Sequence, residues 1–207
     1  LKSHPVNLDR IKRGKRPANS IWLWGEGQRP RLDSFESKFH KKGSVVSAVD
    51  LIKGIGLCAK MSSVDVDGAT GYIDTNFTGK MEAALQEFRK GQDFVYIHVE
   101  APDECGHRGE MENKIKAIEL IDEKILTPLT AALREAGPFR IMVLPDHPTP
   151  LSTKTHASDP VPYLIYDSAR EQCSGVSCFC EETAKQTGNY VEAGPMLIEK
   201  LFSAIQA

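Results

Sequence analysis

The chain has 207 residues and a net charge of −2, and 41% of its residues are hydrophobic. This length is enough for one α/β domain with a sizeable core. The near-neutral charge excludes a general attraction to nucleic acid or to anionic membranes. No apolar stretch reaches the roughly 20 residues that a membrane span needs, and the N-terminus shows no hydrophobic core of a signal peptide.

Apolar runs and turn residues predict the first elements. Basic residues gather near the start, in DRIKRGKR, and again in FHKKG; they form either a solvated edge or a cationic rim for an anionic substrate. A strand is expected over residues 20–25, and a second over 44–49. A helix should follow the second strand, with Leu51, Ile55 and Met61 at roughly helical spacing. Gly54 and Gly56 weaken this helix unless close packing requires them.

The middle of the chain predicts a short strand and glycine-rich turn in VDVDGATGYID, followed by the helix FTGKMEAALQEFRKG. Thr75 or Asn76 could cap that helix, and Gly91 ends it. The next strand, over residues 93–100, is apolar nearly throughout, as expected of a strand that is covered on both faces. His98 within it is expected to be a core histidine.

A long helix is predicted over residues 110–136, interrupted or kinked at Pro128 and ended by Gly137. Six residues form its expected buried stripe: Ile115, Ile118, Ile121, Ile125, Leu129 and Leu133. Strands follow over 139–144 and 160–167, and EAGPMLIEKLFSAI closes the chain as an amphipathic helix. This alternation predicts a mainly parallel sheet between helices, with functional groups at the carboxyl ends of the strands.

Aspartates and histidines stand at two of those strand ends and in a later segment. Asp103 and His107 lie in EAPDECGH, Asp146 and His147 in LPDHPTP, and His156 in KTHASDP. Carboxylate oxygens and imidazole nitrogens are ligands for divalent cations. A single Asp-x-x-x-His is common by chance, but two polar residues directly after an apolar strand need a partner. The three clusters together predict loops that hold two metal ions.

The cysteines point to a reducing environment. Five of them occur at irregular spacing: Cys58, Cys105, Cys173, Cys178 and Cys180. An odd number without a regular pattern fits a cytoplasmic protein. Cys173, Cys178 and Cys180 could be imagined as a zinc knot, but their spacing is unusual and no fourth ligand is nearby. We expect them to be loop thiols.

Several motifs, in order along almost the whole chain, resemble the cofactor-independent phosphoglycerate mutases, and most closely the archaeal-type branch. They are IWLWGEG, SAVDLIKGIG, GATGYIDTN, EAPDECGH, LPDHPTP and THASDPVP. The resemblance implies membership of the alkaline phosphatase superfamily, with a three-layer α/β/α sandwich and two divalent ions such as Mn²⁺, Mg²⁺ or Zn²⁺. Asp103, His107 and His156 then match the ligands of one ion, and Asp146 and His147 match half of the second site.

The same resemblance implies that residues 1–207 are the C-terminal part of a phosphatase-like domain, incomplete at the N-terminus. Neither the family's N-terminal aspartate nor its nucleophilic serine has a matching motif here, and the inserted substrate-binding domain is also absent. In the family, a phosphoryl group passes from phosphoglycerate to that serine and back to the other hydroxyl. We therefore expect a glycolytic mutase as the parent protein, and no activity from this chain alone.

Two questions stay open at this stage. A cation should hold the substrate phosphate, and Lys53 and Arg10 are the candidates, although a solvated helix lysine is an equal interpretation of Lys53. The chain could also be a non-catalytic metal-binding fragment, or belong to a metal-dependent phosphatase or phosphotransferase for another small phosphorylated substrate. We expect no nucleic acid or membrane partner, and self-association of the fragment through its uncovered sheet edge.

Overall fold

The computed structural model describes residues 1–23 and 25–203, which form two units, Leu1–Arg31 and Leu32–Ala207. The first unit contains one helix, α1 (Pro5–Lys12), whose Asn7 side chain is buried and bonds to the carbonyls of Leu1 and Ala18. The strand expected over residues 20–25 is wrong for its described residues, which form no strand; Trp22 is 86% exposed. Trp24 lies outside the described residues.

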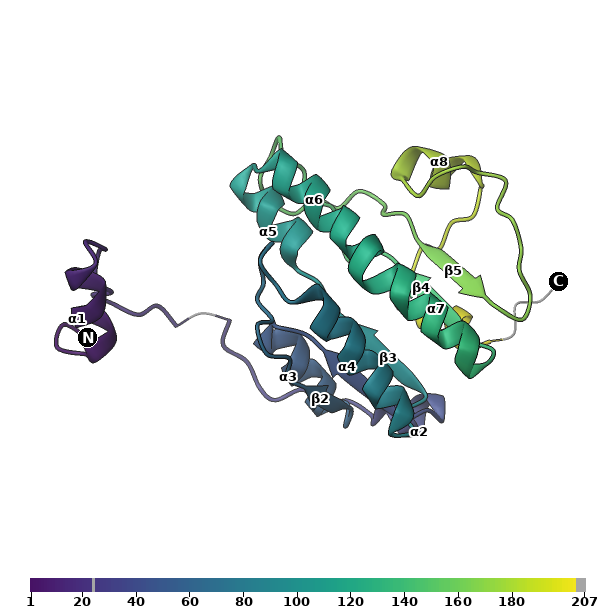
Figure 1. Ribbon diagram of the computed structural model, residues 1–207, viewed down its shortest axis with the longest axis horizontal. Helices are drawn as coiled ribbons and strands as arrows, with labels where there is room; N and C mark the ends of the chain where they lie inside the picture. The colour runs from purple at the N-terminus through teal and green to yellow at the C-terminus, as the bar shows by residue number, and fades with distance from the viewer. Residues whose placement is uncertain (24, 204–207) are drawn as a thin grey trace. The chain divides into compact units, whose positions relative to one another are not determined.

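The second unit is an α/β structure (Figure 1). Its elements in chain order are α2 (Phe35–Phe39), β1 (Gly43–Val46), α3 (Asp50–Cys58), β2 (Ser62–Val64), α4 (Phe77–Arg89), β3 (Phe94–Ile97), α5 (Ala101–Arg108), α6 (Met111–Ile121), the π-helix η1 (Asp122–Leu126), α7 (Thr127–Ala136), β4 (Arg140–Val143), β5 (Leu164–Asp167), α8 (Glu181–Gln186), the 3-10 helix η2 (Gly194–Met196) and α9 (Leu197–Phe202). None of the helices described is long and apolar enough to cross a membrane.

The strands form two sheets rather than one. Three parallel strands pair in the order β2-β1-β3, and β4 pairs with β5 in antiparallel fashion. The expectation of a mainly parallel sheet therefore holds for the first three strands and is wrong for the last two. Within the described residues, β3 pairs only with β1 and β4 only with β5, so each of these strands keeps one open edge.

Helices cover both faces of the parallel sheet. Successive residues of a strand point to opposite sides, so neighbouring residues of β1 contact different helices. Ser44 in β1 faces α4, where its hydroxyl donates to Glu87 Oε2 at 2.6 Å. The next residue, Val45, faces α3 and packs in a cluster with Phe35 and Met61. A second cluster forms between α4 and the α6–η1–α7 rod (Figure 1) and includes Phe77, Met81, Ala117, Ile125 and Leu129.

The helix predictions were right in position and partly wrong in their buried faces. Asn76 caps α4 by accepting the N–H of Gly79 at 2.8 Å, and Gly91 follows the helix with φ +91°. In α3, however, Leu51 and Ile55 are 70% and 48% exposed. The buried face of α3 carries Gly56 instead, because no larger residue fits there against β1.

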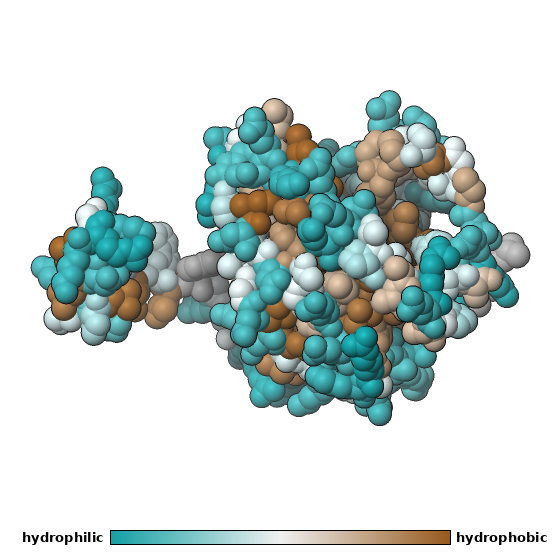
Figure 2. All heavy atoms as spheres, in the orientation of Figure 1, coloured by the Kyte–Doolittle hydropathy of each residue, from teal (hydrophilic) through white to brown (hydrophobic). Residues whose placement is uncertain are grey.

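The long helix is interrupted as predicted, by a π-helical turn just before Pro128. Its later stripe is correct, since Ile125 and Leu129 are buried. Its earlier part is wrong: Ile115 and Ile118 are 52% and 54% exposed, and apolar residues appear at the surface over the α5–α6 region in Figure 2. The strand β3 is also not fully covered, because Tyr96 is 39% exposed.

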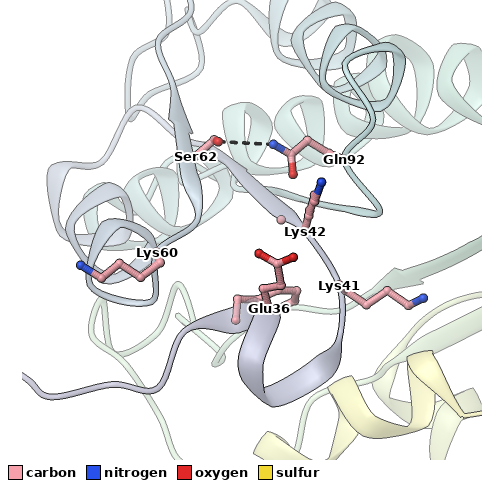
Figure 3. Close-up of a pocket in the computed structure, with 8 residues that line it drawn as sticks. Glu36, Lys41, Lys42, Lys60, Ser62 and Gln92 are labelled. Carbon is pink, nitrogen blue, oxygen red and sulfur yellow. Dashed lines mark hydrogen bonds between the residues drawn. The ribbon is translucent and has the colours of Figure 1, made fainter.

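A small hollow of about 190 Å³ lies at the amino ends of the parallel strands (Figure 3). Lys41 and Lys42 line it, just before β1, together with Ser62 and Gln92, whose side chains bond at 3.3 Å. Lys41 and Lys60 extend to opposite sides of this hollow in Figure 3. Because the predicted ligands follow the carboxyl ends of strands, the lysines of FHKKG do not form a rim around them.

The packing of α3 on β1 gives a direct stability prediction. An ideal Cβ placed on Gly56 would lie 2.6 Å from Val45 Cγ2, whereas one on Gly54 meets nothing within 4 Å. Gly56→Ala should therefore lower the free energy of unfolding by about 1–3 kcal/mol through overpacking. Gly54→Ala, the matched control in the same helix, should raise it by up to about 1 kcal/mol. Urea unfolding measures both, and equal effects of the two substitutions would contradict this packing.

Candidate metal centre

The first two predicted ligands lie on a helix and not on a loop, which corrects the sequence interpretation. Asp103 and His107 are four residues apart on α5, so they share one helical face. Asp103 Oδ2 lies 3.3 Å from His107 Nε2. The helix begins with Pro102 in its first turn and ends at Gly109, which has φ +73°. This short helix directly after β3 presents both side chains at the carboxyl end of that strand.

The third predicted ligand comes from a distant segment to the same point. His156 Nε2 lies 3.0 Å from His107 Nε2 and 3.4 Å from Asp103 Oδ1. Two ligands bound about 2.1 Å from one ion lie about 3.0 Å apart at a right angle and about 3.4 Å apart at the tetrahedral angle. The three separations fall in this range, with Asp103 facing His107 through Oδ2 and His156 through Oδ1. The spacing and the donor types of these three residues therefore fit a single divalent ion.

Asp146 and His147 join the same group from the end of β4. Asp146 Oδ2 lies 3.4 Å from His147 Nε2, and Asp146 Oδ1 accepts the backbone N–H of His147 at 3.0 Å. The His147 ring lies against that of His156, with centroids 3.8 Å apart and the ring planes tilted by 31°. Ligand atoms of Asp103, His147 and His156 all lie within 4.8 Å of one another. The structure thus brings the five predicted residues into one continuous group.

Neighbouring polar groups orient these ligands. The hydroxyl of Thr149, a buried residue, donates a short hydrogen bond to Asp103 Oδ1 and lies 3.4 Å from His147 Nδ1. His107 Nδ1 lies 3.0 Å from the carbonyl oxygen of Lys154. When Nδ1 donates to that carbonyl, the lone pair of His107 is on Nε2, the atom that faces Asp103 and His156. Lys154 has the left-handed φ of +54° that a non-glycine residue rarely adopts.

Three further charged residues near the site have no counterpart in the sequence predictions. Glu100 and Glu104 form a second group of possible metal ligands with Asp103, made of three carboxylates. Burial, followed by repulsion from Glu104 and Asp103, raises the pKa of Glu100 above its ordinary value. Lys80, only 1% exposed, donates to the carbonyl oxygen of His98 at 3.0 Å. Burial lowers the pKa of Lys80 to about 8, against the attraction of Glu100.

A signal for Lys80 was present in the sequence. It lies between Phe77 and Ala84 at helical spacing, so it occupies the buried face of α4. Glu100 and Glu104 flank the predicted ligand Asp103 and could have been included with it. His98, predicted to be a core histidine, is only half-buried; its Nδ1 lies 3.2 Å from Ser47 Oγ, and burial lowers its pKa.

The two predicted substrate-binding cations, Lys53 and Arg10, belong to different units of the chain. Lys53 lies on α3 and its Nζ donates to Asp65 Oδ1 at 2.6 Å. Arg10 belongs to the first unit, where its Nε donates to the carbonyl oxygen of Arg16 at 2.9 Å. Neither contact tests a role in substrate binding, so both assignments stay predictions.

Comparison with known proteins assigns this chain to a family. The model of the metalloenzyme superfamily matches residues 3–204. A probable 2,3-bisphosphoglycerate-independent phosphoglycerate mutase of Geobacter sulfurreducens is 49% identical over 97% of this chain and 50% of its own length. The 2,3-bisphosphoglycerate-independent phosphoglycerate mutase of Methanosarcina mazei is 51% identical over 89% of this chain and 47% of its own length.

Solved structures agree with these relatives. A protein of Pyrococcus horikoshii has a TM-score of 0.71 and 31% identity over 90% of this chain and 48% of its own. The cofactor-independent phosphoglycerate mutase of Thermoplasma acidophilum has a TM-score of 0.60 and 26% identity, over 97% and 47%. The chain spans about half the length of each of these relatives. It belongs to the metalloenzyme superfamily, as a homologue of about half of an archaeal-type 2,3-bisphosphoglycerate-independent phosphoglycerate mutase.

Proposed function

We propose that this chain is the carboxyl-terminal half of a phosphoglycerate mutase that interconverts 3-phosphoglycerate and 2-phosphoglycerate without a bisphosphoglycerate cofactor. The observation that carries the proposal is the group around Asp103, in which five aspartate and histidine side chains from three segments come together. The names of the relatives supply the substrate class. The complete protein would be a cytoplasmic, glycolytic enzyme with a three-layer sandwich, and its nucleophilic serine and inserted substrate-binding domain would lie outside residues 1–207.

The proposed centre of the complete protein holds two divalent ions, such as Mn²⁺, Mg²⁺ or Zn²⁺. Asp103, His107 and His156 would hold the first ion, and Asp146 and His147 would provide half of the ligands of the second. Bound ions of this kind would supply Lewis-acid stabilisation of the charge on a transferring phosphoryl group. Thr149 and the carbonyl of Lys154 keep the ligand atoms of Asp103 and His107 turned inward.

Lys53 and Arg10 are the proposed cations for the substrate phosphate. Lys53 already pairs with Asp65, whose side chain is well exposed, so the pair is weak and can exchange its partner. The proposed substrate is a small phosphorylated molecule, as the names of the relatives imply.

Two alternative functions use the same residues. A phosphatase or phosphotransferase with another small phosphorylated substrate could have the same metal centre, because these ligands do not choose the substrate. A non-catalytic metal-binding fragment would hold one ion and turn over nothing. The gene sequence upstream of Leu1 separates the second alternative from an enzyme: an aspartate after a first strand and a nucleophilic serine would indicate the enzyme.

Metal content tests the proposed ligands. The chain, dialysed after loading with Zn²⁺ or Mn²⁺, should retain about one ion, and His107→Ala with His156→Ala should remove it because two of three ligands are lost. His40→Asn is the matched control, since it removes an exposed imidazole while asparagine suits the left-handed φ of 53° at that position. Mass spectrometry of the metals gives the ratio. A wild-type chain that retains no ion, or variants that all retain it equally, would contradict the site.

Enzyme assays test the assignment to half of a mutase. Residues 1–207 alone should show no conversion of 3-phosphoglycerate to 2-phosphoglycerate, because the proposed nucleophile lies outside them. The complete Geobacter sulfurreducens relative, assayed in parallel, is the positive control. Turnover by residues 1–207 above the rate of the His107→Ala, His156→Ala double variant would show that the chain is sufficient for catalysis.

The open strand edges predict the behaviour of the isolated chain. Unpaired edges of β3 and β4 and the exposed apolar residues of α6 favour contacts with other copies. Light scattering should therefore detect dimers or larger species that increase with protein concentration. A monomer at all concentrations would contradict this expectation.

A further inference from the structure

Cys178 and Cys180 lie close together on the segment between β5 and α8, outside the metal centre. Their Sγ atoms are 3.7 Å apart, with only Phe179 between them in the chain. Both are free thiols; Cys178 is exposed and Cys180 is half-buried. An S–S bond is about 2.0 Å long. To form a disulfide, the two sulfur atoms would have to approach from 3.7 Å to about 2.0 Å. They lie on a segment whose side chains reach the solvent.

The two sulfur atoms have different hydrogen-bond partners, and this difference distinguishes the attacking cysteine from its partner. The Thr183 hydroxyl oxygen lies 3.3 Å from Cys180 Sγ and 3.9 Å from Cys178 Sγ. Hydrogen bonding from that hydroxyl, and next from the backbone N–H of Thr183 and the thiol of Cys178, lowers the pKa of Cys180 below its ordinary value. The thiolate is the reactive form of cysteine. Cys180 is therefore the attacking group, and the exposed Cys178 is its neighbour.

The hydroxyl of Thr183 has only one hydrogen to donate. It lies 2.7 Å from the carbonyl oxygen of Cys178 and 3.2 Å from that of Cys180, so either carbonyl can accept it while Cys180 is protonated. When Cys180 ionises, rotation about the Cβ–Oγ1 bond turns the same hydrogen toward its sulfur. Thr183 thus favours the charged form of the Cys180 sulfur.

We propose that Cys178 and Cys180 are a redox modification site, at which a small disulfide such as oxidised glutathione converts the two thiols into one intramolecular disulfide. The Cys180 thiolate attacks one sulfur of the small disulfide, and one glutathione thiolate leaves. Cys178 then attacks Cys180 in the mixed disulfide and releases the second glutathione thiolate, which takes up the proton of the Cys178 thiol. The two cysteines are oxidised by two electrons, and the small disulfide is reduced to two thiols.

A disulfide explains the pair better than a metal ion does. Structural zinc sites use four ligands, and among the described residues neither sulfur belongs to a group of three metal-ligand atoms. Cys173 is exposed and belongs to no such group either. Disulfides in cytoplasmic proteins are usually transient or redox-sensing, so the pair suits reversible oxidation in the compartment that the cysteine pattern predicts. This inference does not depend on the proposed mutase function.

Oxidised glutathione and mass spectrometry of the native chain test the site. The wild type should lose two hydrogens and carry no glutathione on these residues, and a peptide with Cys178 linked to Cys180 should appear after digestion. Cys178→Ser should instead accumulate one glutathione on Cys180, because the resolving thiol is missing. Cys180→Ser should react at Cys178 at least tenfold more slowly. Dithiothreitol should reverse each change.

Cys173→Ser is the matched control, since it removes an exposed thiol from the same segment and should leave the disulfide unchanged. A wild-type chain that carries glutathione on Cys180 as stably as Cys178→Ser would overturn the proposal. A disulfide that joins Cys173 to either residue would also overturn it.

Discussion

The carboxylate of Asp103 is the contact on which the candidate site depends. One of its oxygens lies 3.3 Å from His107, its neighbour on α5, and the other lies 3.4 Å from His156, which follows β4. The hydroxyl of Thr149 fixes the second oxygen. The Asp103 side chain therefore contacts both the segment after β3 and the segment after β4. Carboxylate and imidazole groups are ligand types for divalent ions, which is why we propose a metal ion at this point.

The sequence predicted which residues would come together better than it predicted their local structure. Asp103 and His107 stand out by residue type, but the loop predicted around them is the helix α5. Pro102 and Gly106 within it are residues typical of turns, so the local sequence does not mark this helix clearly. Proline in the first turn is compatible with a helix, and only the surrounding packing decides between the two. Likewise, nothing in the spacing of Asp146 and His147 revealed that the ring of His147 contacts that of His156.

The fold predictions failed where burial was inferred from hydrophobicity alone. Leu51 and Ile55 of α3 and Ile118 of α6 are apolar and exposed, while Gly56 packs tightly against Val45 and Ala117 is fully buried. A pattern of large apolar residues cannot tell a face covered by this chain from one left open. The homologues are about twice as long as this chain, and the open edges of β3 and β4 and these exposed residues are surfaces that further chain could cover.

Anomalous X-ray scattering from crystals of the chain soaked in Zn²⁺ tests the central claim most directly, because it locates the ion without reference to activity. We predict a zinc peak about 2.0–2.2 Å from the ligand atoms of Asp103, His107 and His156. Zinc bound elsewhere, with these three side chains free of metal, would contradict the account.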